Sequence, residues 1–212
     1  MLALLILVAA GYYIRQDLKF ENGGRVINPS PLPTVPAPTA PVPTPLPASI
    51  KKPIPDLPFP VEIKANMSKE AKKIALDKIQ ELILGLKENP EMENYWIELG
   101  LQRKLIGDFE GAGEAWEYAA YIRPGDFIPR SNLGDLYAYS LNEMNKAEAN
   151  FLAAIKLEPT AIMVYQKLYE LYRFKMKNDQ KAKAILEEGI KKNPSTSERL
   201  QSILDEWNLE TT

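Results

Sequence analysis

Apolar residues recur at helical spacing from about residue 61 to the end of the chain, and no segment there shows the period-two alternation of a strand. This pattern predicts an all-α domain over residues 63–212. Its first helix is expected at 69–88, after Ser68 as N-cap, and its last at about 197–208, where Ser195-x-x-Glu198 forms a capping box. Their predicted buried stripes are Ala71, Ala75, Ile79, Leu82 and Leu86 in the first helix, and Leu200, Ile203, Leu204 and Trp207 in the last.

The N-terminal segment Leu2–Ile14 has a different pattern, because it is uncharged and almost wholly apolar. As a helix it would extend about 20 Å, less than the roughly 30 Å hydrocarbon core of a bilayer. Tyr12 and Tyr13, followed by Arg15, resemble the interfacial end of a membrane segment. We interpret residues 1–20 as a membrane anchor or signal-anchor helix.

Between these regions lies a proline-rich tract that holds 13 of the 18 prolines, from Pro29 to Pro60. Proline fixes φ and disfavours helix in the residue before it, so such a tract favours extended polyproline II. We predict a disordered linker over residues 21–62, within which the part from Pro29 to Pro60 would reach about 100 Å when extended. Residues 52–58 also fit a basic-x-x-P-x-x-P ligand pattern, although a spacer is the favoured interpretation.

Four of the remaining prolines are regularly spaced. Pro90, Pro124, Pro159 and Pro194 are separated by 34, 35 and 35 residues. A fixed period of this length in a helical domain indicates a solenoid of stacked repeats.

Other positions recur in register with these prolines. The first unit contains Trp96-x-x-Leu99-Gly100, Ala112-x-x-x-Trp116 and Ala119; the second contains Leu133-Gly134-x-x-Tyr137, Ala147-x-x-x-Phe151 and Ala154; the third contains Tyr165-x-x-Leu168, Ala182-x-x-x-Leu186 and Gly189. This pattern resembles the tetratricopeptide repeat family. The resemblance implies an αα-superhelix of about three helix-turn-helix repeats, at about 91–124, 125–159 and 160–194, with flanking capping helices and eight helices in all.

Two departures from regular repeats are expected to affect packing. Tyr169 stands in the third unit where the first two have glycine, which affects the closest helix crossing there. The second and third units carry one extra residue, which we place in their internal turns, around residues 142–145 and 177–180.

The resemblance also implies a concave groove, lined by the first helix of each repeat, that binds a peptide or a helix of a partner protein. Helical geometry places the candidate residues opposite the buried stripe of each first helix. They are Asn94, Ile97, Glu98, Leu101 and Leu105 in the first repeat, Asn132, Asp135 and Tyr139 in the second, and Lys167, Glu170, Arg173 and Phe174 in the third. Leu101, Leu105, Tyr139 and Phe174 are the favoured anchors. Because Glu98, Asp135 and Glu170 oppose an anionic terminus, we expect no carboxylate clamp.

Composition narrows the functional classes. The chain has no histidine and no cysteine, which excludes Ser-His-Asp and Cys-His catalysis, disulfides and ordinary zinc or haem sites. We therefore predict a non-enzymatic protein with no cofactor. Its net charge of −2 gives no strong field for nucleic acid, so no nucleic-acid partner is expected.

Together these observations predict a membrane-tethered scaffold whose repeat domain binds a protein partner. The alternative is a structural or assembly component of a cell-surface or secretion/pilus-type machine, with homo-oligomers formed through the N-terminal helix. A long stalk behind a signal-anchor-like segment favours a single-pass protein with an extracytoplasmic repeat domain. Arg15, Lys19 and Arg25 after the apolar segment leave the cytoplasmic side open.

Overall fold

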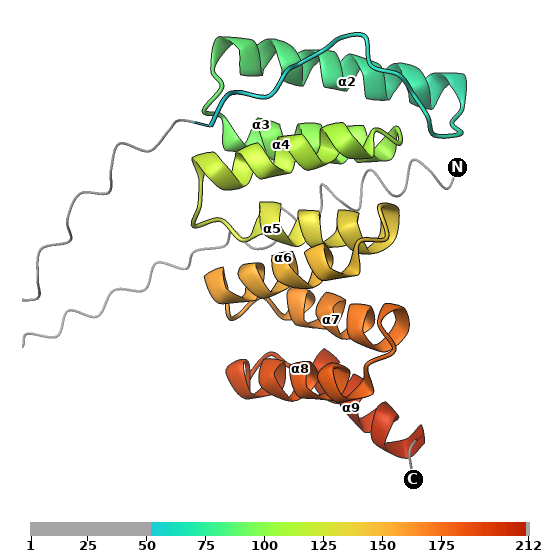
Figure 1. Ribbon diagram of the computed structural model, residues 1–212, viewed down its shortest axis with the longest axis vertical. Coiled ribbons are helices and arrows are strands. Elements are labelled where there is room, and N and C mark those ends of the chain that lie inside the picture. Colours follow the sequence, from blue (N-terminus) through green and yellow to red (C-terminus); the bar gives the residue numbers. More distant parts are fainter. Residues whose placement is uncertain (1–51, 211–212) are drawn as a thin grey trace, which may run out of the picture. The chain divides into compact units, whose positions relative to one another are not determined.

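The computed structural model describes residues 52–210, and this part of the chain is all-helical (Figure 1). It has the expected eight α-helices, two of which continue into a π-helical segment. The elements are α2 (Lys69–Glu88), α3 (Glu93–Leu105), α4 (Phe109–Ile122), α5 (Ile128–Asp135) with η1 (Leu136–Ser140), α6 (Met144–Leu157), α7 (Ile162–Glu170) with η2 (Leu171–Lys175), α8 (Asp179–Lys192) and α9 (Glu198–Glu210). Helices α3 to α8 pair consecutively as antiparallel hairpins and stack into an αα-superhelix, which confirms the predicted fold class.

The repeating prolines lie directly after helices. Each stands two residues beyond the last residue of α2, α4, α6 or α8, namely at Pro90, Pro124, Pro159 and Pro194. Proline cannot continue a helix, since it lacks the N–H and its ring clashes with the preceding turn. The 34- and 35-residue spacing therefore records the ends of successive second helices.

Small residues let the two helices of a hairpin approach closely. A Cβ on Gly100 would come within 2.4 Å of the Trp116 indole Nε1, and one on Gly134 within 2.5 Å of the Phe151 ring. Trp116 also donates from Nε1 to the carbonyl of Ile97 at 2.9 Å, which fixes its ring against α3.

The extra residue of the second and third repeats lies in the first helix. There the N–H of Leu141 bonds to the carbonyl of Leu136 at 3.0 Å, and that of Met176 to Leu171 at 2.9 Å, which are i→i+5 bonds. The first helix thus absorbs one residue as a π turn, so the predicted place of the insertion, in the interhelical turn alone, is wrong. A residue with positive φ follows each π segment, Asn142 at 59° and Lys177 at 54°.

Residues 52–67 form an extended segment, here called the strap, that crosses α2 in Figure 1. Its apolar side chains pack against the core formed by α2, α3 and α4, although the first eleven residues lie within the predicted linker. These side chains are Leu57, Val61, Ile63 and Met67. The backbone N–H groups of Lys64 and Ala65 both donate to the Ile106 carbonyl at 2.9 Å, which attaches the strap to the α3–α4 turn.

The C-terminal helix closes the stack. Leu200 and Trp207 of α9 are buried against the third repeat. Helix α9 begins at Glu198, directly after the buried Ser197, and Ser195 lies in the preceding turn. The turn that follows α8 extends to residue 196, so Ser195 does not lie at the position directly before α9. The predicted capping box, which starts at Ser195, is therefore wrong.

None of the helices within residues 52–210 combines the length and the apolar character needed to cross a bilayer. The predicted anchor at Leu2–Ile14 and most of the predicted linker lie outside the described residues.

Candidate functional site

The candidate residues lie on one side of α3, α5–η1 and α7–η2, called here the first-helix face. All four favoured anchors are exposed on it: Leu101 by 48%, Leu105 by 45%, Tyr139 by 47% and Phe174 by 56%. Such large apolar side chains lose contact with water only when another surface covers them. Asn94 is also exposed, and Ile97 and Asn132 are half-buried.

An ion pair joins the second and third repeats on this face. The Lys167 Nζ lies 2.5 Å from Asp135 Oδ2, and both side chains are about four-fifths buried. The same ammonium lies 3.5 Å from the Ser131 hydroxyl. Lys167 is therefore already paired with a carboxylate of the neighbouring repeat.

Tyr139 and Glu170 form a second link between these repeats. The Tyr139 hydroxyl donates to Glu170 Oε2 at 3.4 Å, while Gln166 donates to Oε1 at 3.0 Å. The Lys175 ammonium lies 5.2 Å from the centre of the Tyr139 ring. Burial, reinforced by the carboxylates of Glu170 and Asp135, raises the pKa of Tyr139 to about 12, so its hydroxyl is a hydrogen-bond donor at neutral pH.

In the first repeat, the candidate residues contact the capping helix α2 and the strap. Glu98 pairs with Lys78 of α2 at 3.5 Å. Leu105 lies near the α3–α4 turn, where it lines a hollow of about 430 Å³ together with Lys64 and Phe109. This part of the face is therefore apolar around Leu101 and polar where it meets α2.

Arg173 connects the face to the C-terminal helix. Its guanidinium stacks over the Trp207 ring of α9 at 4.2 Å and lies 2.8 Å from Asp179 Oδ1. Phe174 makes an edge contact with the Tyr169 ring at 6.0 Å between centroids. Arg173 thus orders the edge of the face beside Phe174.

Sequence reasoning missed several side chains of this face. Lys78, Ser131, Gln166 and Lys175 each contact a predicted residue. Gln166 precedes Glu170 by four positions, a spacing that places two residues on one side of a helix and so signals this contact. Lys78 belongs to the capping helix, and only the packing of α2 on α3 brings it to Glu98.

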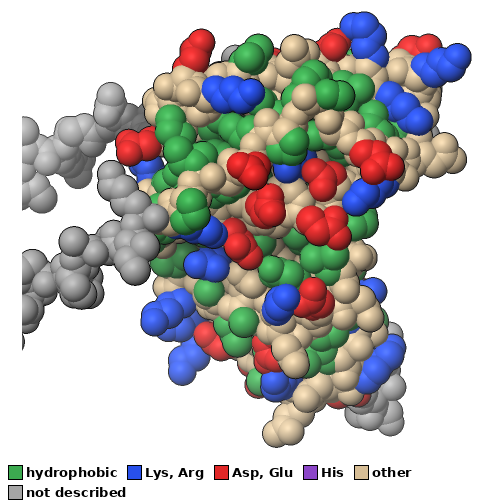
Figure 2. Space-filling view, turned by 45° about the horizontal axis from the view of Figure 1, so that its top comes forward, with side chains coloured by type: hydrophobic (Ala, Val, Ile, Leu, Met, Phe, Trp, Pro, Cys, Tyr) green, Lys and Arg blue, Asp and Glu red, His purple; other side chains and the backbone are tan. Residues whose placement is uncertain are grey.

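The charged groups balance each other over much of the surface. Figure 2 shows acidic side chains gathered over the middle of the face in view, with basic side chains around them. In the part of the chain that the structure describes, no three acidic side chains converge as metal ligands would.

Comparisons with known proteins gave matches among solved structures. No family model and no curated protein matches the sequence. Among solved structures, the chain is similar to "MamA RS-1 ArsTM double mutant", with a TM-score of 0.50 and 15% identity over 69% of this chain and 87% of that one. It is also similar to "MamA MSR-1 C2", with a TM-score of 0.47 and 21% identity over 57% of this chain and 69% of that one.

Because the sequence identity is low, this structural similarity establishes the fold alone. The chain has a tetratricopeptide-like αα-superhelix.

Proposed function

We propose that this protein is a non-enzymatic scaffold that binds a peptide or helix of a partner protein on its first-helix face. The observation that carries the proposal is the row of exposed anchors, in which three successive repeats present Leu101, Tyr139 and Phe174. Repeated apolar anchors on a rigid helical support favour recognition of an apolar segment.

The pairing of charges on this face supports the same conclusion. Asp135 and Lys167 neutralise each other, and Tyr139 donates to Glu170. A partner that covers the Asp135–Lys167 pair would not have to supply a matching charge for it, whereas Glu170 receives hydrogen bonds from neutral donors and keeps its negative charge. The partner's binding free energy would come mainly from apolar burial, at about 25 cal/mol per Å² before the costs of association are subtracted.

Substitution of the anchors tests this proposal. Leu101→Glu, Tyr139→Glu and Phe174→Glu combined in the full-length chain should abolish the capture of proteins that the unmodified chain retains, with helicity unchanged by circular dichroism. The matched control places glutamate at Ile74, Leu84 and Leu152, which are exposed by 44–55% on other surfaces. Capture that survives the first set, or that is lost equally with the control set, would reject the first-helix face as the binding surface.

The tether is a separate part of the proposal. The apolar character of Leu2–Ile14 supports an anchor that holds the repeat domain at a membrane. The long proline-rich stalk behind this segment favours the extracytoplasmic side for the domain. Protease added to spheroplasts or protoplasts, which leave only the cytoplasmic membrane as a barrier, should then degrade the repeat domain. Protection there together with digestion after lysis would place the domain in the cytoplasm, and recovery of the full-length chain in the soluble fraction would reject the anchor.

A further inference from the structure

Three carboxylates lie on the first-helix face, and one of them differs from the others in its partners. Glu98 pairs with Lys78 at 3.5 Å, and Asp135 pairs with Lys167 at 2.5 Å. Glu170 receives hydrogen bonds from two neutral groups, a phenolic hydroxyl at 3.4 Å and a side-chain amide at 3.0 Å. In the part of the chain that the structure describes, Glu170 forms no ion pair, so its negative charge is uncompensated.

Two exposed aromatic side chains accompany this carboxylate along the face. Tyr139, whose hydroxyl donates to Glu170, is 47% exposed, and Phe174, four positions after Glu170, is 56% exposed. A spacing of four places two side chains on the same side of a helix. The Tyr139 ring already attracts a cation of the chain itself, since the Lys175 ammonium lies 5.2 Å from its centre. A carboxylate accompanied by aromatic rings suits a lysine or arginine side chain, whose stem is apolar and whose head is charged.

A wholly apolar partner would cover this carboxylate without pairing it. Tyr139 and Phe174 are anchors of the face, so a segment that covers both also covers Glu170, which is already half-buried. Removing more water from an unpaired carboxylate costs free energy, and a cation supplied by the partner offsets that cost. Residues 26–50 hold no charged side chain, so the chain's own proline-rich tract does not supply this cation.

We propose that the first-helix face selects a segment of a partner protein in which one lysine or arginine stands among apolar residues. Glu170 binds the cation, and the rings of Tyr139 and Phe174 contact its aliphatic stem. The apolar residues of the same segment reach Leu101 in the first repeat. This inference rests on the function proposed above and adds to it the charge of the partner.

Selection from a display library tests this preference. Random short peptides are selected on the full-length chain and then screened on the double variant Leu101→Ala with Phe174→Ala, which loses two anchors and keeps every charge. Peptides that no longer bind the double variant are specific for the first-helix face. Among them, lysine or arginine flanked by apolar residues should be at least about threefold more frequent than among peptides that bind both chains.

Matched peptides measure the contribution of Glu170. One face-specific peptide is labelled with fluorescein and made in two forms, with its basic residue and with norleucine at that position. In fluorescence anisotropy, Glu170→Gln should weaken binding of the basic form by about tenfold, because it removes a charge-assisted contact, and should change the norleucine form by less than about twofold. The matched control is Glu114→Gln, which removes an exposed carboxylate of α4 and should leave both forms unchanged.

Two further variants sharpen the assignment. Lys175→Ala removes the chain's own cation from the Tyr139 ring, so the basic form should bind about two to three times more tightly. Glu170→Lys reverses the charge, and a third form of the peptide, with glutamate at the varied position, should bind this variant better than the unmodified chain. Circular dichroism and urea unfolding verify that each variant is folded.

Several results would overturn the inference. These are face-specific peptides without enrichment of basic residues, unchanged binding of the basic form in Glu170→Gln, equal loss of both forms in that variant, and weaker binding in Lys175→Ala. Self-association of the chain that is lost in Glu170→Gln would assign the site to a second copy in place of a partner. A library without any face-specific peptide would reject the first-helix face itself, whereas face-specific peptides that bind independently of Glu170 would reject this inference alone.

Discussion

The first and third repeats differ in how side-chain volume is divided between the two helices where these cross most closely. In the first repeat Gly100 faces Trp116, so the smallest residue lies against the largest. In the third, Tyr169 and Leu186 stand at the corresponding positions, and both are buried in one core cluster. The Tyr169 ring also lies 6.1 Å from Trp207 of the closing helix. The repeat therefore conserves the combined volume at the helix crossing, and a larger first-helix residue is tolerated when its partner is smaller.

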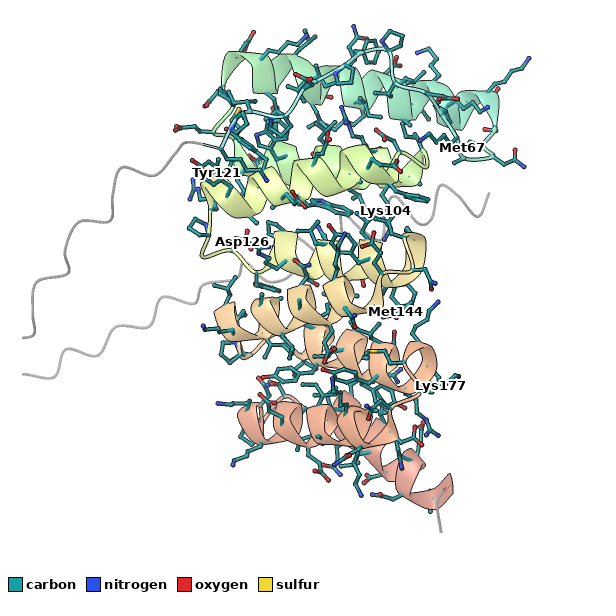
Figure 3. All side chains as sticks on the ribbon, in the orientation of Figure 1. Met67, Lys104, Tyr121, Asp126, Met144 and Lys177 are labelled. Atoms are coloured by element: carbon teal, nitrogen blue, oxygen red, sulfur yellow. The ribbon has the colours of Figure 1, made fainter. Side chains whose placement is uncertain are left out.

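The interhelical turns differ in a related way. In the first repeat the turn is made by Gly107 at φ 82°, directly after a regular α-helix. The other two repeats use a π segment followed by Asn142 or Lys177 in the left-handed region. Figure 3 shows Lys104 and Lys177 at the same edge of the stack, which is the edge of the turns within repeats. An added residue is therefore accommodated without moving the second helix out of the stack.

The junctions between repeats differ in their electrostatics. Glu93 lies where α3 meets the end of α4, with Oε1 buried and unpaired and Oε2 3.9 Å from the Arg123 Nε. Burial and the nearby Asp126 raise its pKa to about 7. Burial alone would also raise the pKa of Glu148 on α6, but hydrogen bonds from Lys181 and Tyr172, at 2.6 and 2.8 Å, lower it below the ordinary value.

The largest expected effect comes from filling the closest helix crossing. Gly100→Ala should lower the free energy of unfolding by about 2–3 kcal/mol, because the added Cβ would overlap the Trp116 ring. The matched control is Gly125→Ala, where no atom lies within 4 Å of an added Cβ, and its effect should stay within about 1 kcal/mol. Urea unfolding measures both. In a Trp116→Leu background, which imitates the third repeat, Gly100→Ala should cost at least about 1 kcal/mol less, and strictly additive effects would contradict the volume argument.

The next effect is the pH dependence of the two junctions. Since the folded pKa of Glu93 lies above the ordinary value of 4.5, the folded state binds more protons between pH 4.5 and 7, and stability falls as pH rises through this window. Glu93→Gln removes that loss. The stability of the variant relative to the unmodified chain should therefore increase by about 2 kcal/mol between pH 5 and pH 8. Thermal unfolding measured across this range provides the test, and parallel pH profiles for variant and unmodified chain would contradict it.

Glu148→Gln is the opposite case within the same experiment. Because the folded pKa of Glu148 is lowered, its contribution is present above pH 4.5 and is lost as pH falls through the folded pKa. The variant should therefore be less stable at pH 7, by about 1–2 kcal/mol, and the difference should shrink in acid. A difference that grows in acid would reject the hydrogen-bonded arrangement.

The smallest effect concerns the turns. Gly107→Ala should cost about 1 kcal/mol, since φ is 82° there, whereas Lys177→Gly should stabilise by about 0.5–1 kcal/mol by removing a side chain from the left-handed region. Asn142→Gly should gain less than Lys177→Gly, because asparagine tolerates this conformation. Chemical denaturation resolves the order, and stabilisation by Gly107→Ala would contradict the assigned turn.

The features that the sequence predicted well are those that depend only on neighbouring residues. A proline cannot continue a helix, so the ends of four helices could be predicted without knowledge of packing. They lie at Pro90, Pro124, Pro159 and Pro194. The anchors Leu101, Tyr139 and Phe174 followed from helical periodicity, and all three are exposed. Their use by a partner remains a prediction.

Other features depend on contacts between distant segments. The strap has no periodic pattern of its own, and Lys52 meets Glu117 across 65 positions of sequence. The π turns accommodate the extra residue of the second and third repeats, and the sequence is equally compatible with an extra residue in the turn that follows. The link from Asp135 to Lys167 depends on which rotation α5 and α7 adopt once their apolar sides are buried.

The amino-acid sequence alone thus determines an all-α domain after the proline-rich tract, with its period, its helix ends and its exposed stripe, and the lack of histidine and cysteine removes whole classes of chemistry. These properties arise from backbone sterics and local periodicity, which act over a few residues. Tertiary packing decided which charges neutralise each other, where the extra residue is absorbed, and that a proline-rich segment lies against the helices. Those outcomes depend on pairwise distances between remote side chains, which are set only when the buried surfaces come together.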